Sequence, residues 1–428
     1  MAWQRAGERA VSRSAFVEGI AHFHRGLEIL EALPVSAARA SHQLSIHLKL
    51  GGPLTATRGY NAPAILELYT RARELCQETG ATEALFDVLS GLWIYHYVGA
   101  DLAVSRELAD QLLAMAEKTG DGTQLLCAGV AMGCTMTNLG EFETAREHLE
   151  RALAFHDPER HIKLMSAWGA DPGIVALVYL ALNLNVLGYP DQGFAAAQRA
   201  FALARVQPHS FSMAWALQTM AFWHLGRGAM AKSLETADAL ITLSREQGFA
   251  QWLAQGMIVH AAAASWIDPP AKTIPLLKDA VTARIATGSR ISHSSFSLPL
   301  VSACLRAGEV ETGLAVVGEL LAHVERTGDR VDESILWLRR GQLFLARTMG
   351  EEIKAELSIQ KALSIARQQR AKSRELVVAV VLARLWQQQG KRAAALALLE
   401  PIYTWFTEGF EHPDLRSARA LLDELSKS

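Results

Sequence analysis

Apolar residues recur every three or four positions along most of the chain. Three segments show the pattern clearly, at 107–118, 145–155 and 355–369, with charged residues on the opposite side of each projected helix. Alternation of apolar and polar residues with a period of two, which is typical of a half-buried strand, is nearly absent over any useful length. The pattern predicts a succession of amphipathic helices that needs no β-sheet.

Glycines separate these helices at regular intervals. One set closes segments as Thr-Gly or Gln-Gly and consists of Gly80, Gly120, Gly248, Gly288 and Gly328. A second set lies between them and consists of Gly99, Gly140, Gly188, Gly226, Gly308, Gly350 and Gly390. Most spacings within a set are about 40 residues or twice that, and glycine favours the left-handed residue that ends a helix. Two interleaved sets with one period predict a repeating unit of two helices.

A small residue recurs five positions after each glycine of the second set. These residues are Ala145, Gly193, Ala231, Gly313, Ala355 and Ala395, with Val104 as the exception. A small side chain there lets the second helix of a hairpin cross close to the first, as in the tetratricopeptide repeat. We therefore expect an all-α, tetratricopeptide-like α-solenoid of helical hairpins, wound as a right-handed superhelix with a period of about 40 residues.

No composition shift marks a domain boundary, so we expect one continuous solenoid over residues 1–428. Within it we expect atypical hairpins and a connector at 1–60, the repeats proper at 61–411 and a capping helix at 412–428. The period is broken by an insertion near 156–173.

The period is also broken at 265–272, where a hinge glycine is missing. At both breaks an aspartate precedes a proline, at Asp157, Asp171 and Asp268. Aspartate accepts hydrogen bonds from the free N–H groups at a helix start, and proline suits the first helical position. We therefore interpret all three aspartates as helix N-caps.

Composition and charge narrow the classes of partner. Hydrophobic residues make up 50% of the 428 positions and charged residues 20%, which excludes a disordered protein. The net charge is −2, which favours neither nucleic acid nor an anionic membrane as a partner, because both attract basic surfaces. The four cysteines form no C-x-x-C pair, and the charged N-terminal segment does not resemble a signal peptide. We expect a cytoplasmic protein.

Motifs of catalysis are missing from the sequence. There is no G-x-x-x-x-G-K-[S/T] phosphate loop, no H-E-x-x-H zinc motif and no G-x-S-x-G elbow. The insertion holds His156, Asp157, Glu159 and His161, whose side chains carry metal-ligating atoms. Structural metal sites use tighter spacing, which favours capping and surface roles for these four. We expect no catalytic residue, no cofactor, no metal and no enzymatic activity.

Without a catalytic motif, the candidate functional surface is the concave face of the solenoid, which the first helix of each hairpin is expected to line. Residues two and three positions before the hinge glycine are expected to point into it, and several are aromatic or hydrogen-bonding residues of the kinds that anchor partners. The candidate binding face consists of His96, Tyr97, Thr137, Asn138, Asn185, Trp223, His224, Arg306, Arg347, Gln387 and Gln388. The alternative is that the aromatic residues pack between repeats and the remainder form a solvated surface.

Four strings in the chain resemble one bacterial module. They are WQRAGERAVSRSAFVEGIAHFHRGLEIL (3–30), ATRGYNAPAILELYTRARELC (56–76), HDPERH with WGADPGIVALVYLALNLNVLGYPDQ (156–192), and ARLWQQQGKRAAALALLEPIYTWFTEGFEHPDLRSARALLDEL (383–425). The module is the tetratricopeptide region at the C-terminus of multidomain proteins that carry a class III adenylate/guanylate cyclase domain and an AAA/STAND-type ATPase domain. The chain departs from it at Ala64, where the family commonly has Glu, and at SWIDPPAK (265–272).

The resemblance implies a regulatory or partner-sensing role, since the cyclase and phosphate-loop domains of those proteins are absent from this sequence. One hypothesis is a non-enzymatic scaffold that binds a protein, peptide or small effector on its concave face, in signalling. Its partner could be an ATPase or cyclase domain. The other is a fragment or regulatory part of a cyclase–ATPase whose catalytic domains lie elsewhere.

Overall fold

The computed structural model describes residues 2–11, 13, 15–158, 170–207, 209–347 and 350–427. Within these ranges it contains helices and no strand. The helices are α1 (Ala2–Val11), α2 (Phe16–Glu31), α3 (Ala37–Arg58), α4 (Pro63–Thr79), α5 (Thr82–Val98), α6 (Leu102–Thr119), α7 (Gly122–Leu139), α8 (Phe142–Leu153), α11 (Pro172–Leu187), α12 (Pro190–Val206), α13 (Ser210–Gly226), α14 (Met230–Gln247), α15 (Ala250–Ala264), α16 (Pro270–Ala286), α17 (His293–Ala307), α18 (Val310–Thr327), α19 (Glu333–Ala346), α20 (Glu352–Gln368), α21 (Lys372–Gln388), α22 (Arg392–Thr404) and α23 (Pro413–Ser426). The all-α solenoid expected from the sequence is confirmed.

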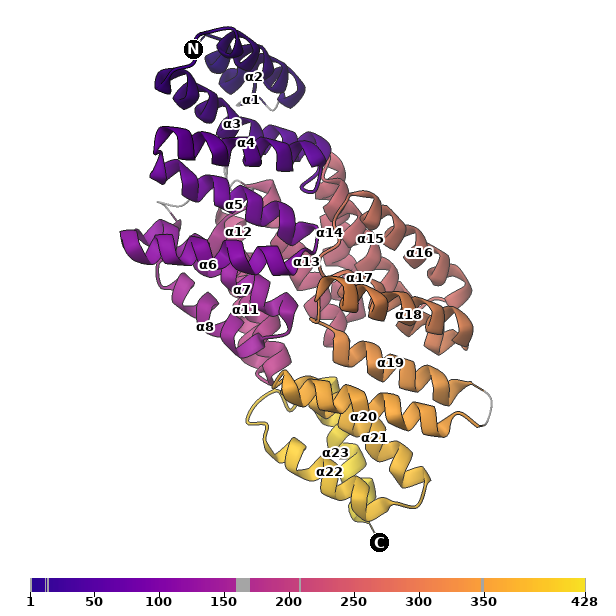
Figure 1. The fold of residues 1–428 in the computed structure, drawn as a ribbon. Helices are drawn as coiled ribbons and strands as arrows, with labels where there is room; N and C mark the ends of the chain where they lie inside the picture. Colours follow the sequence, from indigo (N-terminus) through magenta and orange to yellow (C-terminus); the bar gives the residue numbers. More distant parts are fainter. Residues whose placement is uncertain are drawn as a thin grey trace.

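The first helices of successive hairpins form the inner face of the solenoid. Helices α5, α7, α11, α13, α15, α17, α19 and α21 contact one another in series. Their partners α6, α8, α12, α14, α16, α18, α20 and α22 each pack against the first helix of the same hairpin. Figure 1 shows the result, with α1–α4 at one end of an elongated molecule and α20–α23 at the other.

Seven of the eight hairpins from α5–α6 to α21–α22 turn at a residue in the left-handed conformation, and the turn between α15 and α16, at residues 265–269, has none. At Gly140, with φ of 81°, the Glu141 amide donates to the Met136 carbonyl and the Gly140 amide to Thr137, which satisfies the last carbonyls of α7. Two hinges differ from the predicted positions. The left-handed residue is Ala100 rather than Gly99 in the first, and Gly228 rather than Gly226 in the fourth.

The small-residue rule holds when it is counted from the left-handed residue. Five positions after each one lies a small buried residue: Ser105, Ala145, Gly193, Ser233, Gly313, Ala355 and Ala395. The apparent exception at Val104 therefore disappears. The prediction for Ala231 is wrong, because Gly228 ends the turn two residues late and Ala231 is exposed.

The interpretation as a helix N-cap is confirmed for Asp171, and for Asp157 it stays a prediction. The Asp171 carboxylate accepts from the amides of Gly173 and Ile174 at 2.7 and 3.3 Å and caps α11. For Asp268 the prediction is wrong, since Pro269 is the N-cap of α16 and no side chain caps it. Most of the insertion, including Glu159 and His161, lies outside the described residues.

The solenoid winds far enough to contact itself. The Val98 carbonyl at the end of α5 accepts from the amides of Arg290 and Ile291, just before α17. One hairpin later, the Asn138 carbonyl accepts from the Arg330 amide at 2.7 Å. We call this line of contacts between successive superhelical turns the seam. In Figure 1 it places α5–α8 beside the later hairpins around α17 and α18.

The seam continues toward the C-terminus. The Ser373 hydroxyl at the start of α21 donates to the Asn185 carbonyl at 2.6 Å, across 188 residues of sequence. The Glu408 carboxylate, just before α23, accepts from the amides of Asp191 and Gln192 at 2.9 and 3.1 Å. These contacts join the α11–α12 hairpin to α21 and to the segment before α23.

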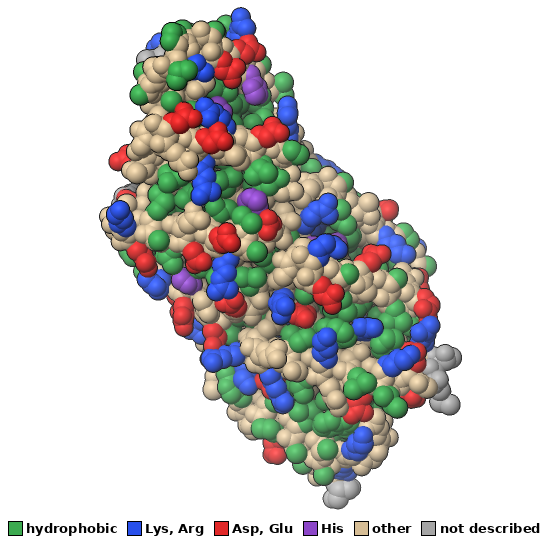
Figure 2. Space-filling model, in the orientation of Figure 1, with side chains coloured by type: hydrophobic (Ala, Val, Ile, Leu, Met, Phe, Trp, Pro, Cys, Tyr) green, Lys and Arg blue, Asp and Glu red, His purple; other side chains and the backbone are tan. Residues whose placement is uncertain are grey.

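The outer surface has mixed charge. On the face in Figure 2, acidic and basic side chains are interspersed among apolar ones. Among the described residues, no helix is long and apolar enough to cross a membrane.

The corrected hinge register can be tested with substitutions at two positions of α14 that lie two residues apart. Ser233 is fully buried at the helix crossing, so Ser233→Leu should overpack it and lower the free energy of unfolding by about 1–3 kcal/mol. Ala231→Leu, on the exposed side of α14, should change it by no more than about 0.5 kcal/mol. Urea denaturation measures both, with Ala145→Leu as the reference for an overpacked crossing. Equal effects at 231 and 233 would contradict the register.

Candidate binding pocket on the inner face

Polar side chains fill the interior along the seam. The Tyr97 hydroxyl lies 2.6 Å from that of Tyr179 and donates to Asn138 Oδ1 at 2.8 Å. The Asn138 side chain in turn donates to Asp329 Oδ1 and to the Ser292 hydroxyl, each at 2.9 Å. Three inner helices and two loops of the following turn are thus joined by one buried network.

Asp329 is the charged member of this network. It is completely buried, and burial raises the pKa of its carboxyl group to about 7. Hydrogen bonds from Asn138 and from the backbone amides of Ser292 and Val331 oppose that rise because they stabilise the carboxylate. The ionisation of Asp329 is therefore sensitive to how well the two turns fit together.

The predicted binding face divides into three groups. Tyr97, Thr137 and Asn138 are buried in the seam and do not line an open groove. Asn185 and Trp223 are partly exposed and line a pocket described below. The remaining members are partly or fully exposed away from that pocket: His96, His224, Arg306, Arg347, Gln387 and Gln388.

Several exposed members of the predicted face already have partners within the chain. Arg347 forms ion pairs with Glu311 and Glu351 at 2.9 and 3.6 Å. The guanidinium of Arg306 lies 4.3 Å above the ring of Trp266. His96 contacts Asp101 at 3.1 Å. These side chains are held at hairpin ends rather than gathered at one site.

A cavity of about 260 Å³ opens on the inner face between α11, α13, α15 and α17. Its walls are mainly aromatic, and neighbouring rings support one another: Tyr179 contacts Trp215, Trp215 contacts Trp252 with centroids 4.9 Å apart, and Phe222 contacts Phe296. Asn185, Gln218, Gln251, Ser295 and His412 add polar groups to the lining. We call this cavity the inner pocket.

Three buried polar groups of the inner pocket have no hydrogen-bond partner among the described residues. They are Trp252 Nε1, Gln255 Oε1 and Arg284 Nε. The exposed fractions of these side chains are 3%, 4% and 1%. More than nine-tenths of buried polar groups in proteins are paired, so three unpaired groups around one cavity make the inner pocket the candidate binding site.

Arg284 is the buried charge of the inner pocket. Its guanidinium donates to Ser289 and to the Ile291 carbonyl and lies 4.2 Å above the ring of Phe296. Burial lowers its pKa to about 10, and the nearby carboxyl group of Asp329 opposes that shift without touching it. The guanidinium is therefore held in one place with Nε unused.

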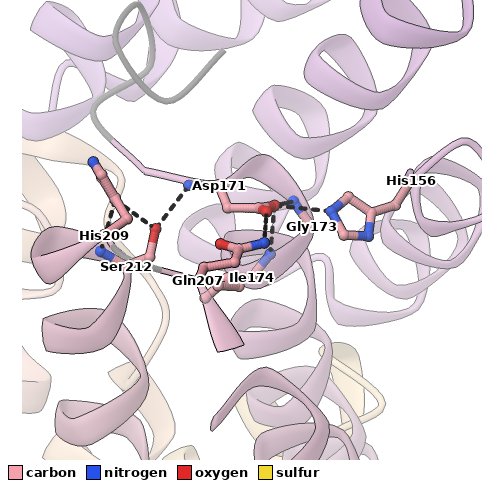
Figure 3. A network of polar contacts seen from close by, with 7 residues as sticks. All are labelled: His156, Asp171, Gly173, Ile174, Gln207, His209 and Ser212. Carbon is pink, nitrogen blue, oxygen red and sulfur yellow. Dashed lines mark hydrogen bonds and ion pairs between the residues drawn. The ribbon is translucent and has the colours of Figure 1, made fainter. Parts of the chain in front are cut away.

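A second polar cluster lies beside the insertion (Figure 3). The Asp171 carboxylate lies 2.9 Å from His156 Nε2 and accepts a hydrogen bond from the Gln207 side-chain amide at 2.6 Å. The Asp171 backbone amide donates to the Ser212 hydroxyl, which also contacts His209. Burial would raise the pKa of Asp171, but the hydrogen bonds from His156 and Gln207 outweigh burial and keep it below its usual value. This cluster caps α11 and α13.

The described residues hold no group of three or more His, Cys, Asp or Glu that could bind a metal. The Asp171 carboxylate is already shared among four donors, the side chains of His156 and Gln207 and the amides of Gly173 and Ile174.

One sequence pattern points to the inner pocket, and it does not depend on the distance from a hinge glycine. Leu277, Ala280, Val281 and Arg284 follow the spacing of a buried helical stripe, and the first three are buried. An arginine at the fourth place of such a stripe is unusual, because arginine is seldom fully buried without a partner. Trp215 and Trp252 lie about three helical turns before the ends of α13 and α15, too far for a rule centred on the hinge.

A comparison with solved structures supports the fold through one protein, and a second match is weaker. A Rap protein complexed with Competence and Sporulation Factor has a TM-score of 0.59 and 11% identity, over 86% of this chain and 97% of that one. A signal transduction ATPase with numerous domains (STAND) from Pyrococcus horikoshii, with a tetratricopeptide repeat sensor, gives 0.46 and 14%, and this chain spans 54% of its length. No family model matches the sequence, and no curated protein matches it. The chain is a tetratricopeptide-like helical solenoid.

The seam predicts a specific pH dependence. Because the folded pKa of Asp329 is about 7 and its ordinary value is 3.8, the folded chain binds more protons than the unfolded chain between these values. This group therefore lowers the stability of the wild type as pH rises from 4 to 7. The free energy of unfolding of Asp329→Asn relative to wild type should rise over that interval in urea titrations.

The matched control for this measurement is Asp279→Asn, at an exposed aspartate of α16. Comparing each variant with the wild type at the same pH removes the contributions of the other titrating groups, including the buried His293 and His323. A difference for Asp329→Asn that stays level from pH 4 to 7 would show that the seam does not perturb this carboxyl group.

Proposed function

We propose that the chain is a binding module without catalytic activity, and that the inner pocket holds a group of a protein or peptide partner. The observation that carries the proposal is the set of three unpaired buried polar groups, on Trp252, Gln255 and Arg284, around an aromatic cavity. Aromatic walls supply apolar contact, and a few fixed polar groups supply orientation, which is the usual composition of a recognition pocket.

The polar groups also argue against the inner pocket being a packing defect. Leaving one buried donor or acceptor unpaired costs about 1–3 kcal/mol, so three together weaken the folded chain appreciably. A ligand that pairs with them recovers that free energy on binding. Asn185 and Trp223, predicted from the sequence, belong to this pocket, and we propose the exposed members of the predicted face as contacts for the rest of a large partner.

We propose a signalling or regulatory role on the strength of the sequence resemblance. In proteins of that architecture the tetratricopeptide region accompanies cyclase and ATPase domains, so an ATPase or cyclase domain is one partner to test. The alternative, that this chain is the regulatory part of such an enzyme, assigns the same binding role to the same pocket.

The proposal is tested by selecting peptides from a random phage-displayed library on the immobilised chain. Gln218 lies half-buried in the pocket wall, so Gln218→Trp should fill the cavity and weaken the selected peptides at least about tenfold. Fluorescence anisotropy of labelled peptides measures the affinity, and thermal unfolding checks that the variant is folded.

Gln198→Trp is the matched control, since Gln198 is exposed on α12 and belongs neither to the inner pocket nor to the predicted binding face. It should leave the affinity unchanged. If Gln218→Trp weakens the peptides no more than Gln198→Trp does, the pocket assignment is wrong.

A further inference from the structure

We infer that the inner pocket binds a carboxylate carried on an apolar or aromatic body, with Arg284 as the residue that receives the carboxylate. The inference rests on the proposed function and names the chemistry of the group that the pocket holds. It follows from the charges of the lining, the fixed position of the guanidinium and the size and character of the cavity.

The side chains that line the inner pocket and can carry a charge near neutral pH are all basic. Arg227, Arg284 and His412 belong to the described lining, and no aspartate or glutamate does. Two of them have an acidic partner: Arg227 lies 3.6 Å from Asp191, and His412 lies 3.5 Å from Asp414. Arg284 is the cation without an ion pair among the described residues.

A buried cation without a contacting anion is unfavourable in a protein interior. Asp329 acts on Arg284 through space, but its two carboxylate oxygens are already taken by Asn138 and the Ser292 amide. An anion brought in by a ligand would therefore find a cation that no carboxylate of the described residues contacts. A neutral ligand would leave that imbalance as it is.

The guanidinium is arranged in advance for such a ligand. Its terminal nitrogens are anchored by Ser289 and the Ile291 carbonyl, and its face lies against Phe296. The remaining donor, Nε–H, can form a charge-assisted hydrogen bond, which is about twice as strong as a neutral one. Little side-chain entropy is lost on binding, because Arg284 is already immobile.

The cavity sets the size of the apolar body. About 260 Å³ is slightly less than the range of about 300–1,000 Å³ for small-molecule sites, which suits one large side chain or a small aromatic acid. Trp215, Trp252 and Phe296 offer ring faces and edges around it. Trp252 Nε1–H adds a neutral donor for a second oxygen.

This ligand chemistry has two sources, the C-terminus of a peptide that ends in an aromatic residue and a free aromatic acid. Isothermal titration calorimetry with 2-naphthoate and 2-naphthamide tests the shared chemistry, since the two probes differ in charge and hardly in size. The naphthoate should bind one site per chain at least about tenfold more tightly than the amide.

Two variants assign that preference to the inner pocket. Gln255→Glu keeps the shape of the side chain and places a carboxylate in the same cavity, so it should weaken naphthoate at least about tenfold and leave naphthamide unchanged. Arg284→Gln should make the two probes equal. Arg339→Gln, at another largely buried arginine outside the pocket, is the control and should preserve the preference.

The peptide arm compares acetyl-Gly-Ser-Gly-Trp with a free carboxyl terminus and with a terminal amide. Tighter binding of the free peptide than of naphthoate assigns the pocket to a C-terminus, and the reverse order assigns it to a free acid. Equal affinity for naphthoate and naphthamide, no binding of either, or an unaltered preference in Gln255→Glu would overturn the inference. Phage-selected peptides that still depend on the pocket would then leave the proposed function standing.

Discussion

The fold depends on one local constraint, a left-handed residue in the turn after each inner helix from α5 to α21 except α15, and a small residue five positions later. The left-handed turn satisfies the last carbonyls of the helix and reverses the chain within a few residues. The small residue then lets the returning helix cross at close range. The same geometry recurs in seven hairpins. The small rotation of each hairpin relative to the one before it therefore accumulates into a superhelix whose successive turns contact each other.

That closure changes what the inner face can do. In an open solenoid the ends of the inner helices would line a groove, and polar residues there would face a partner. Here the coil brings the following turn against them, so Asn138 binds Asp329 and the Val98 carbonyl binds two amides of a later loop. Residues that would suit recognition of another protein instead hold the chain to itself.

Much of the fold could be predicted because it is encoded locally. Glycine spacing and apolar periodicity specify hairpins within 40 residues or so, and Asp171 caps α11 through contacts two and three residues away. The errors at Gly226 and Ala231 arose because two nearby glycines compete for the turn, and only the structure shows that Gly228 makes it. The seam could not be predicted, since Asn138 and Asp329 are 191 residues apart and no periodicity relates them.

The inner pocket lies next to the part of the inner face where hydrogen bonds between successive superhelical turns end. The ends of α5, α7 and α11 each meet a later segment through the seam, whereas the cavity lies between α11, α13, α15 and α17, beside the loop that the seam fixes before α17. That loop supplies Ser289 and Ile291, which anchor Arg284, and Ser292, which binds Asp329. The pocket and the seam thus share one loop, because Ile291, which anchors Arg284, is followed directly by Ser292, which binds Asp329. A ligand bound to Arg284 would therefore act on the same loop that closes the coil.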